Sequence, residues 1–494
     1  MKILNAKICS NGQIFDGEVT VDGERIASVT PKETSSSSDE TIIDAKGMYV
    51  IPGLLDVHFH GCVGYDTCDA SKEAFDKIAE YEGSEGVLAI CPATMTYPED
   101  KLSEIMDIAA DYESPVGADF VGLHLEGPFI NPNRVGAQNS DYVQKPDADM
   151  LLRLQERAKG RIRICDVAPE TENAIDFVEK IKDHVASVSI AHTCTDYDTA
   201  MQAFEHGANH LTHGFNAMPG IHHRKPGPLS AAADAEADVE LICDNVHIHP
   251  SVVRLAFKLF TDEHVILISD TMRACGLKDG CYDLGGQQVE VKGNLATLAS
   301  DSATIAGSVT NLMNCLRCAV KTMKIPFASA VKAATHNPAR SIGVLDDYGD
   351  VEAGKYANLL ILDEATSGLD PVMREEILDI FLEFVENEEH SILLSSHITS
   401  DLERIADYIT FIHNGRIILT ETKDNLIYNY AILRCSDKNF LSLDKEDIVA
   451  YRKKDYQIDV LVSDIEKAKR KYPKIIIDHT TIDEIMLLLV KGEN

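Results

Sequence analysis

The chain has 494 residues, which predicts two or three domains, and its 45% hydrophobic content supports sizeable cores. Lysine and arginine number 46 against 80 aspartates and glutamates, and this net charge of −34 argues against nucleic acid or an anionic membrane surface as the main partner. The 12 cysteines lack a disulfide-like spacing, the first residues lack the apolar core of a secretory signal, and no run approaches the roughly 20 apolar residues of a membrane span. We therefore expect a cytoplasmic protein with reduced thiols.

The first 53 residues predict a small β domain. Polar and apolar residues alternate there, and turn signals stand at Asn11-Gly12 and Asp22-Gly23. Residues 343–363 return to a β pattern and are expected to rejoin this domain as part of a β-sandwich.

Residues 54–342 change to an alternation of strand-like and helix-like segments. Helical periodicity appears at 71–83, 99–113, 171–184 and 251–260. The apolar segments lie near 54–60, 86–92, 119–125, 161–167, 187–191, 208–212, 239–243 and 265–269. Eight strands alternating with helices predict an α/β protein with a (β/α)8 barrel. Residues 281–300 are expected to form an inserted β excursion.

Metal-ligand side chains close several of these apolar segments. They are His58, His60, Glu126, His192 and His213, with Asp270 as a further acidic candidate. A parallel barrel brings the carboxyl ends of its strands together at one face. One histidine at a strand end is more often a packed or capping residue, but five such residues in the same position indicate a metallohydrolase.

The spacing of these residues suggests how metal ions would be held. Because side chains alternate along a strand, His58 and His60 lie on one face and can bind one divalent ion. Glu126 is placed to bridge to a second ion held by His192 and His213. Zinc and iron both suit these donors, and the sequence is compatible with one ion, two ions, or one tight and one weak site.

Asp270 closes the eighth predicted strand. This position suits a general base toward the attacking water and, later in the reaction, a general acid. A carboxylate among several imidazoles is a more specific signal than the His-x-His pair alone.

Seven segments carry a resemblance to a known family. DVHFHG, HLEGPFINP, AHT, THGFNAMPG, DNVHIHP, ISDTM and TIAGS, in this order, resemble the N-acetylglucosamine-6-phosphate deacetylases of the amidohydrolase superfamily over residues 1 to about 363. The resemblance implies metal-dependent release of acetate from N-acetylglucosamine 6-phosphate, with glucosamine 6-phosphate as the other product. It implies Glu126, His192 and His213 as metal ligands, Asp270 as the catalytic acid/base, and a homodimer.

The same resemblance implies the substrate contacts. They are Ala137, Gln138, Asn216, Ala217, Arg224, His247, Ile305, Ala306 and Gly307. Gln138, with Ala137, occupies a place on the substrate rim where some members carry His. Asn216 and Ala217 would contact sugar or phosphate, and His247 would contact the substrate near the acetamide. Residues 305–307 would close the site.

A basic loop supplies the positive charge that an anionic substrate needs against the acidic background. His222, His223, Arg224 and Lys225 follow the sixth predicted strand, and Arg224 can bind a phosphate in bidentate geometry. An exposed basic loop without a binding role is the alternative. A deacetylase for another phosphorylated acetamido sugar, or a different amidohydrolase, also fits the pattern.

After Glu364 the character of the chain changes. LLILDEATSGLDP (359–371) and the later SILLSSH resemble the C-terminal part of an ABC-transporter ATPase over about 359–494. The resemblance implies Asp363 as the Walker B magnesium ligand, Glu364 as the catalytic carboxylate and His397 as the switch histidine. An ABC nucleotide-binding subunit with a membrane permease as partner is therefore an alternative function.

The phosphate-binding loop of such an ATPase is missing. GDVEAGKY (349–356) has the spacing, but Tyr356 stands where magnesium binding needs Ser or Thr, and a strand is expected to follow instead of a helix. LGGQQ (284–288) imitates the ABC signature motif, but it lies in the expected β excursion and is not part of an ATPase. We therefore expect residues 364–494 to be a partial ABC segment, poorly packed and without ATPase activity. The point near residue 363 where the two resemblances meet would also remove the last strands of the β-sandwich. A gene fusion and a sequence-assembly error would both give such a chain.

Overall fold

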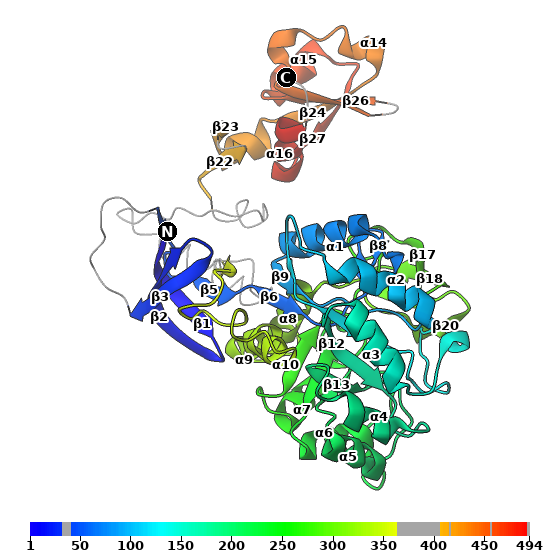
Figure 1. Ribbon diagram of the computed structural model, residues 1–494. Helices are drawn as coiled ribbons and strands as arrows, with labels where there is room; N and C mark the ends of the chain where they lie inside the picture. Colours follow the sequence, from blue (N-terminus) through cyan, green and yellow to red (C-terminus); the bar gives the residue numbers. More distant parts are fainter. Residues whose placement is uncertain (32–40, 363–405, 414–415, 455–456, 492–494) are drawn as a thin grey trace. The chain divides into compact units, whose positions relative to one another are not determined.

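The computed structural model describes residues 1–31, 41–362, 406–413, 416–454 and 457–491 (Figure 1). The chain divides into two compact units, Met1–Asp363 and Glu364–Asn494. Within the described residues, no helix has the length and apolar character needed to cross a membrane.

The small β domain of the first unit is a six-stranded sheet. Its strands are β1 (Lys2–Ser10), β2 (Gln13–Asp22), β3 (Arg25–Pro31), β4 (Ile42–Asp44), β5 (Tyr49–Pro52) and β21 (Leu359–Leu362). The order is β21-β5-β1-β2-β3, and β1 also pairs with β4. The predicted turn at Asn11-Gly12 is confirmed: Ser10 pairs with Gln13, and both turn residues have positive φ, as a tight hairpin requires. Late in the chain, β21 returns to pair antiparallel with β5.

Parallel strands form the centre of the first unit. One sheet has the order β10-β9-β6, from β6 (Leu54–Asp56), β9 (Val87–Ile90) and β10 (Asp119–Phe120). The other runs in chain order through β11 (Leu123–Leu125), β12 (Ile162–Val167), β13 (Ser187–Ile190), β14 (His210–Leu211), β15 (Asp238–Ile242) and β16 (Val265–Ile268). Each of the eight predicted apolar segments therefore contributes to a parallel half-barrel architecture.

Backbone contacts tie the two parallel sheets together at their carboxyl ends. Ala93 bridges to His124 between the second and third segments. The Asp270 N–H donates to the His58 carbonyl (3.0 Å), and the His60 N–H donates to the Thr271 carbonyl (2.7 Å). The last parallel strand therefore delivers its terminal residues beside those of the first.

Helices surround the parallel strands (Figure 1). They are α1 (Lys72–Ser84), α2 (Glu99–Ala110), α3 (Ala148–Arg157), α4 (Ala174–Ile181), α5 (Tyr197–His206), α6 (Gly227–Asp234), α7 (Pro250–Leu259), α8 (Leu312–Lys321), α9 (Phe327–Ala334) and α10 (His336–Ser341). Side-chain oxygens of Ser71, Asp147 and Asp196 accept N–H groups in the first turns of α1, α3 and α5, so these helices begin where their caps stand. Short elements β7 (Gly61–Cys62), β8 (Tyr65–Asp66) and two 3-10 turns (Thr67–Asp69, Ser140–Tyr142) complete the connections.

The inserted β excursion is confirmed. Strands β17 (Gly280–Leu284), β18 (Gln287–Lys292), β19 (Leu295–Leu298) and β20 (Asp301–Ile305) form an antiparallel sheet, with LGGQQ at the turn between β17 and β18. The segment 349–356 is also no phosphate loop: Lys355 is buried, its Nζ donates to the Leu345 and Tyr348 carbonyls, and strand β21 follows.

The described part of the second unit holds a compact α/β arrangement. A hairpin of β22 (Tyr408–His413) and β23 (Arg416–Thr422) precedes α13 (Lys423–Tyr428). Then follow β24 (Ala431–Cys435), α14 (Asp437–Phe440), a 3-10 turn (Lys445–Asp447), β25 (Ala450–Lys454), β26 (Gln457–Val462), α15 (Ile465–Lys471), β27 (Ile476–His479) and α16 (Ile482–Lys491). The sheet order β25-β26-β24-β27 with antiparallel neighbours is the ferredoxin-like βαββαβ pattern.

The prediction of a poorly packed tail is wrong for these residues. Leu433 and Val460 are buried in one apolar cluster, whereas Ile432 and Leu461, their neighbours along the strands, are buried in another on the opposite face. Apolar residues on both faces of β24 and β26 allow the sheet to pack on each side. The predicted ATPase residues Asp363, Glu364 and His397 lie outside the described residues.

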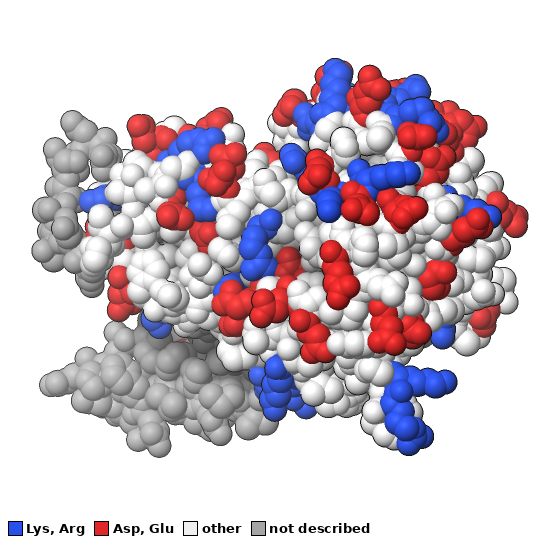
Figure 2. All heavy atoms as spheres, turned by 60° about the horizontal axis from the view of Figure 1, so that its bottom comes forward, with Lys and Arg blue, Asp and Glu red and all other residues white. Residues whose placement is uncertain are grey.

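The face drawn in Figure 2 carries Asp and Glu side chains interspersed with Lys and Arg. Exposed ion pairs of the first unit include Arg153–Glu99 (2.7 Å) and Lys77–Glu80 (2.7 Å). Such pairs stabilise a fold by at most about 1 kcal/mol each, so the fold depends on its cores instead.

We expect residues 1–363 to fold without the second unit, because their apolar clusters are built only from residues before Asp363. A chain truncated after Asp363 should give one cooperative thermal transition, followed by circular dichroism. An insoluble product, or one that unfolds without a cooperative transition, would show that the first unit needs the remainder of the chain.

Candidate metal centre

The predicted ligands are positioned by a shared backbone feature at the strand ends. His192, His213 and Asp270 each stand two residues beyond the end of a parallel strand. All three have positive φ (41°, 30° and 51°), a backbone conformation that residues other than glycine adopt rarely. The three side chains are thereby turned into the space above the strands. Strained backbone repeated at neighbouring strand ends is typical of a functional site.

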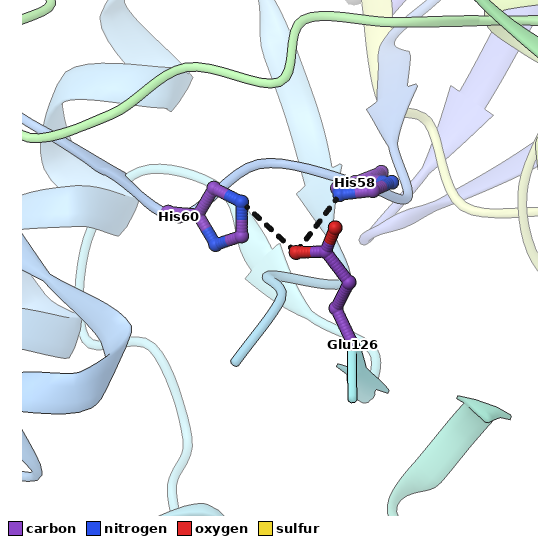
Figure 3. A group of neighbouring side chains, drawn as sticks. All are labelled: His58, His60 and Glu126. Atoms are coloured by element: carbon purple, nitrogen blue, oxygen red, sulfur yellow. Dashed lines mark ion pairs between the residues drawn. The ribbon is translucent and has the colours of Figure 1, made fainter. Parts of the chain in front are cut away.

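Glu126 is the residue on which the cluster converges. Its carboxylate is almost fully buried, and its Oε1 lies 2.9 Å from His192 Nε2 and 3.3 Å from His213 Nε2. Its Oε2 lies 3.2 Å from His60 Nε2 and 3.7 Å from His58 Nε2 (Figure 3). The two oxygens therefore face two different pairs of imidazoles, as the sequence predicted for a bridging carboxylate.

Two of the imidazoles are held in the tautomer that a metal ligand needs. The Arg134 carbonyl lies 2.8 Å from His192 Nδ1 and can only accept, so this nitrogen carries a hydrogen, and in the neutral ring Nε2 is the nitrogen that offers a lone pair to a metal ion. The ionised Glu240 carboxylate, 2.8 Å from His58 Nδ1, has the same effect there.

The donor set fits a divalent cation. Among the described residues, three groups of ligand atoms lie close enough to share an ion. Two of them contain Glu126, namely His58 with His60 and Glu126, and His192 with His213 and Glu126, and the third is His58, His124 and Glu240. His58 Nε2 is buried and has no hydrogen-bond partner within the described part of the chain. A buried nitrogen without a partner destabilises a fold, and a bound cation would supply the missing partner. Imidazole nitrogens with carboxylate oxygens suit zinc or iron.

The carboxylates of the centre stay ionised. Burial raises the pKa of Glu126, but hydrogen bonds from His192 and His213 outweigh it and hold the pKa well below its usual value. Burial likewise raises the pKa of Asp270, and the hydrogen bond from His60 together with the nearby imidazoles lowers it overall. The centre therefore presents anionic oxygens that attract a cation.

Asp270 lies on the His58–His60 side of Glu126. Its Oδ1 is 3.4 Å from His60 Nε2 and 3.8 Å from His58 Nε2, and its exposed fraction is 8%. Gly307, one of the predicted closing residues, packs beside it, since a Cβ there would lie 3.2 Å from the Asp270 carbonyl oxygen. Its neighbours Ile305, half-buried at the end of β20, and Ala306, buried, lead into this contact.

His247 is braced by an aspartate that sequence reasoning missed. Asp244 Oδ2 lies 2.7 Å from His247 Nδ1, and Asp244 Oδ1 accepts the N–H groups of Val246 and His247 (2.9 Å each). Burial opposes a charge on His247, but Asp244 outweighs this and raises its pKa. Because Nδ1 faces Asp244, Nε2 is free to face a substrate.

The remaining predicted contacts differ in how they meet the centre. Asn216 donates its Nδ2 hydrogens to the His213 and Gly214 carbonyls (3.2 Å each), and the Ala217 carbonyl accepts from the Thr193 N–H (3.1 Å). The Ala137 carbonyl accepts from Gln287 Nε2 (2.6 Å) on β18. Asn216 and Ala217 therefore lie against the loops that carry His213 and His192.

Gln138 and Arg224 lie at opposite extremes. Gln138 is buried, and its Nε2 donates to Glu126 Oε2 (2.8 Å), so its side chain reaches the centre itself. Arg224 is exposed, and in the described structure its side chain contacts the neighbouring His223 (Nη1 to Nε2, 2.7 Å) instead of the ligand cluster.

Sequence reasoning also missed a polar network inside the parallel strands. Glu240 is fully buried: its Oε2 accepts the His213 N–H (3.0 Å) besides His58 Nδ1, and its Oε1 lies 3.0 Å from His210 Nε2. His124 Nε2 lies 2.9 Å from Asp166 Oδ1. Each of these side chains has a hydrogen-bond partner within the network, so we interpret them as support for the candidate ligands instead of a further metal site. Their signal in the sequence is a charged residue inside an apolar strand, as in VELIC.

Comparison with known proteins places the chain in a family. Residues 49–387 match the model of the Amidohydrolase family, which is more than half of the chain. The chain belongs to the amidohydrolase family. The parallel half-barrel with an N-terminal β-sandwich and a buried His/Glu cluster agrees with this assignment.

Two relatives of this amidohydrolase are deacetylases. The chain is 34% identical over 366 residues to N-acetylglucosamine-6-phosphate deacetylase of Bacillus subtilis. The matched region covers 72% of this chain and 91% of the relative. The chain is 30% identical to N-acetylgalactosamine-6-phosphate deacetylase of Escherichia coli O157:H7, with 72% and 93% covered.

Solved structures give the same picture. N-acetyl-D-glucosamine-6-phosphate deacetylase of Mycobacterium smegmatis, in complex with N-acetyl-D-glucosamine 6-phosphate, is 27% identical with a TM-score of 0.68 and covers 74% of this chain and 95% of its own. The Thermotoga maritima enzyme is 28% identical with a TM-score of 0.65, with 74% and 95% covered. None of these matches is to an ATP-binding protein, so the ABC-type interpretation of residues 364–494 stays a prediction.

We expect Glu240→Gln to weaken zinc binding by roughly 10- to 100-fold, the usual effect of removing a group that orients a metal ligand. An amide offers one acceptor oxygen where the carboxylate serves His58, His210 and the His213 N–H. Competition with a chelator measures the affinity. Glu82→Gln is the matched control, because the Glu82 carboxyl is equally buried and its oxygens have no hydrogen-bond partner among the residues that the structure describes. Equal zinc affinity in both variants would contradict the role of Glu240.

Proposed function

We propose that this amidohydrolase hydrolyses the acetamide of N-acetylglucosamine 6-phosphate to glucosamine 6-phosphate and acetate. The observation that carries the proposal is the convergence of Glu126 with two pairs of imidazoles beside Asp270. The relatives support the substrate class, because the Bacillus subtilis and Mycobacterium smegmatis proteins are named for this reaction.

In this proposal Glu126, His192 and His213 would hold one divalent ion, and His58, His60 and Glu126 would hold a second. A bound zinc or iron ion supplies a Lewis acid that polarises the amide carbonyl and makes a nearby water more acidic.

Asp270 moves the protons of the reaction. Its carboxylate takes a proton from the water whose oxygen adds to the carbonyl carbon. It then passes the proton to the amine nitrogen as the C–N bond breaks, because an amine leaves readily only when protonated. His247 orients the acetamide through Nε2, with Asp244 fixing the ring.

Further residues are proposed to bind the sugar phosphate. Ala137, Asn216 and Ala217 would line the rim, and residues 305–307 would close the site. Arg224 would bind the phosphate, since its basic loop is exposed and available to an anion. We also propose a homodimer, on the resemblance to the family.

For the architecture, we propose that the two parallel sheets belong to one (β/α)8 barrel spanning 54–342, with 1–53 and 343–363 as the small β domain. The contacts between the first and last parallel strands support this. Residues 364–494 are proposed as a partial ABC segment. A nucleotide-binding subunit acting with a membrane permease is the alternative function, and it rests on the motifs of Asp363, Glu364 and His397.

We expect Asp270→Asn to lower acetate release by at least roughly 100-fold while zinc stays bound, because an amide cannot exchange the proton. Acetate release and metal content are measured on the same preparation. Near-wild-type turnover with metal bound would remove Asp270 from proton transfer.

Arg224→Ala should lower kcat/KM for N-acetylglucosamine 6-phosphate by roughly 10- to 100-fold, the scale of one charge-assisted contact to phosphate. Unphosphorylated N-acetylglucosamine should be affected much less. Arg153→Ala, an exposed arginine on α3, serves as the control. Equal losses with both sugars would exclude phosphate recognition by Arg224.

A second candidate substrate is N-acetylgalactosamine 6-phosphate, because a relative at 30% identity is named for it. Parallel assays with both epimers, each with and without the phosphate, decide between them. The epimer with the higher kcat/KM is the substrate.

A further inference from the structure

Gln138 lies in the loop that follows β11, and its side chain points into the metal centre. Its exposed fraction is 4%. Its Oε1 accepts the Thr96 N–H (2.7 Å), and its Nε2 donates to Glu126 Oε2 (2.8 Å). Its backbone N–H also donates to the Val135 carbonyl (2.8 Å), so both the side chain and the backbone are engaged.

These two partners fix the orientation of the Gln138 amide. A backbone N–H only donates, so Thr96 must face the amide oxygen. An ionised carboxylate only accepts, so Glu126 must face the amide nitrogen. A flipped amide would oppose donor to donor and acceptor to acceptor, and the assignment is therefore unambiguous.

The contact matters because the terminal torsion of a glutamate is soft. Rotation of the Glu126 carboxylate would exchange or misalign the oxygens that face the two imidazole pairs. Gln138 holds Oε2 from a third direction, beside His60 and His58. Oε1 is thereby left to His192 and His213.

We propose that Gln138 is a positioning residue that keeps Glu126 in its bridging orientation and so sets the affinity of the centre for a second divalent ion. The inference rests on the proposed metal centre and differs from the substrate contact that the family resemblance implies. Both polar ends of the side chain already have partners inside the protein.

The test measures zinc binding to the full-length protein by chelator competition. Gln138→Met keeps the length of the side chain but removes the amide. It should lower the affinity for the second zinc equivalent by roughly 10- to 100-fold. Gln138→Asn withdraws the amide from Glu126 and keeps its polarity, so it gives the same answer if the methionine variant does not fold.

Gln287→Ala is the matched control. Gln287 holds the adjacent Ala137 carbonyl from β18, so its loss loosens the same loop without removing the contact to Glu126. Zinc affinity that falls in the Gln138 variants but not in Gln287→Ala supports the proposal. Equal losses in all variants would overturn it, because the loop and not the amide would then be responsible.

A substrate-contact role makes the opposite prediction. It would raise KM for N-acetylglucosamine 6-phosphate at saturating zinc and leave zinc affinity at the wild-type value, which also overturns the proposal. The zinc titration needs no substrate. If zinc binding depends on Gln138 but no acetate is released from any sugar, the substrate assignment fails and the positioning role stands.

Discussion

The carboxylate of Glu126 is a negative charge held almost entirely away from water, and the centre is arranged around it. Burying an unpaired carboxylate is very costly, so its oxygens must be compensated by donors or by a cation. Four imidazoles and the Gln138 amide meet this requirement from four different segments of the chain. The strand ends have to converge for these contacts to form, which links the fold to the site.

A second buried carboxylate extends this arrangement into the interior of the parallel strands. Glu240 compensates its charge with His58 and His210, and burial, which alone would raise its pKa, is outweighed so that the pKa lies well below its usual value. It also accepts the backbone N–H of His213. One carboxylate therefore orients the His58 imidazole and holds the backbone of His213, which reach the two oxygens of Glu126. Both Glu240 oxygens have partners, and satisfied buried groups of this kind rigidify a core.

The convergence of the candidate ligands was predictable from the sequence because two simple rules apply. Parallel strands end at one face, and side chains alternate along a strand, so His58, His60, Glu126, His192 and His213 were expected to meet. The roles of Gln138 and Glu240 were not predictable, because each depends on which neighbouring atom it faces across loops and strand registers. The packing of the described part of the second unit was misjudged for a related reason: the burial of both faces of β24 and β26 becomes visible only with their pairing.

We propose that the converging imidazoles and Glu126 form a metal centre that hydrolyses a phosphorylated acetamido sugar. The most direct measurement follows bound metal and acetate release from N-acetylglucosamine 6-phosphate on one preparation, through chelation and then re-addition of zinc or iron. Acetate release should fall in step with the bound metal and return with it. Protein shown to be free of metal that still releases acetate at the full rate would contradict the account.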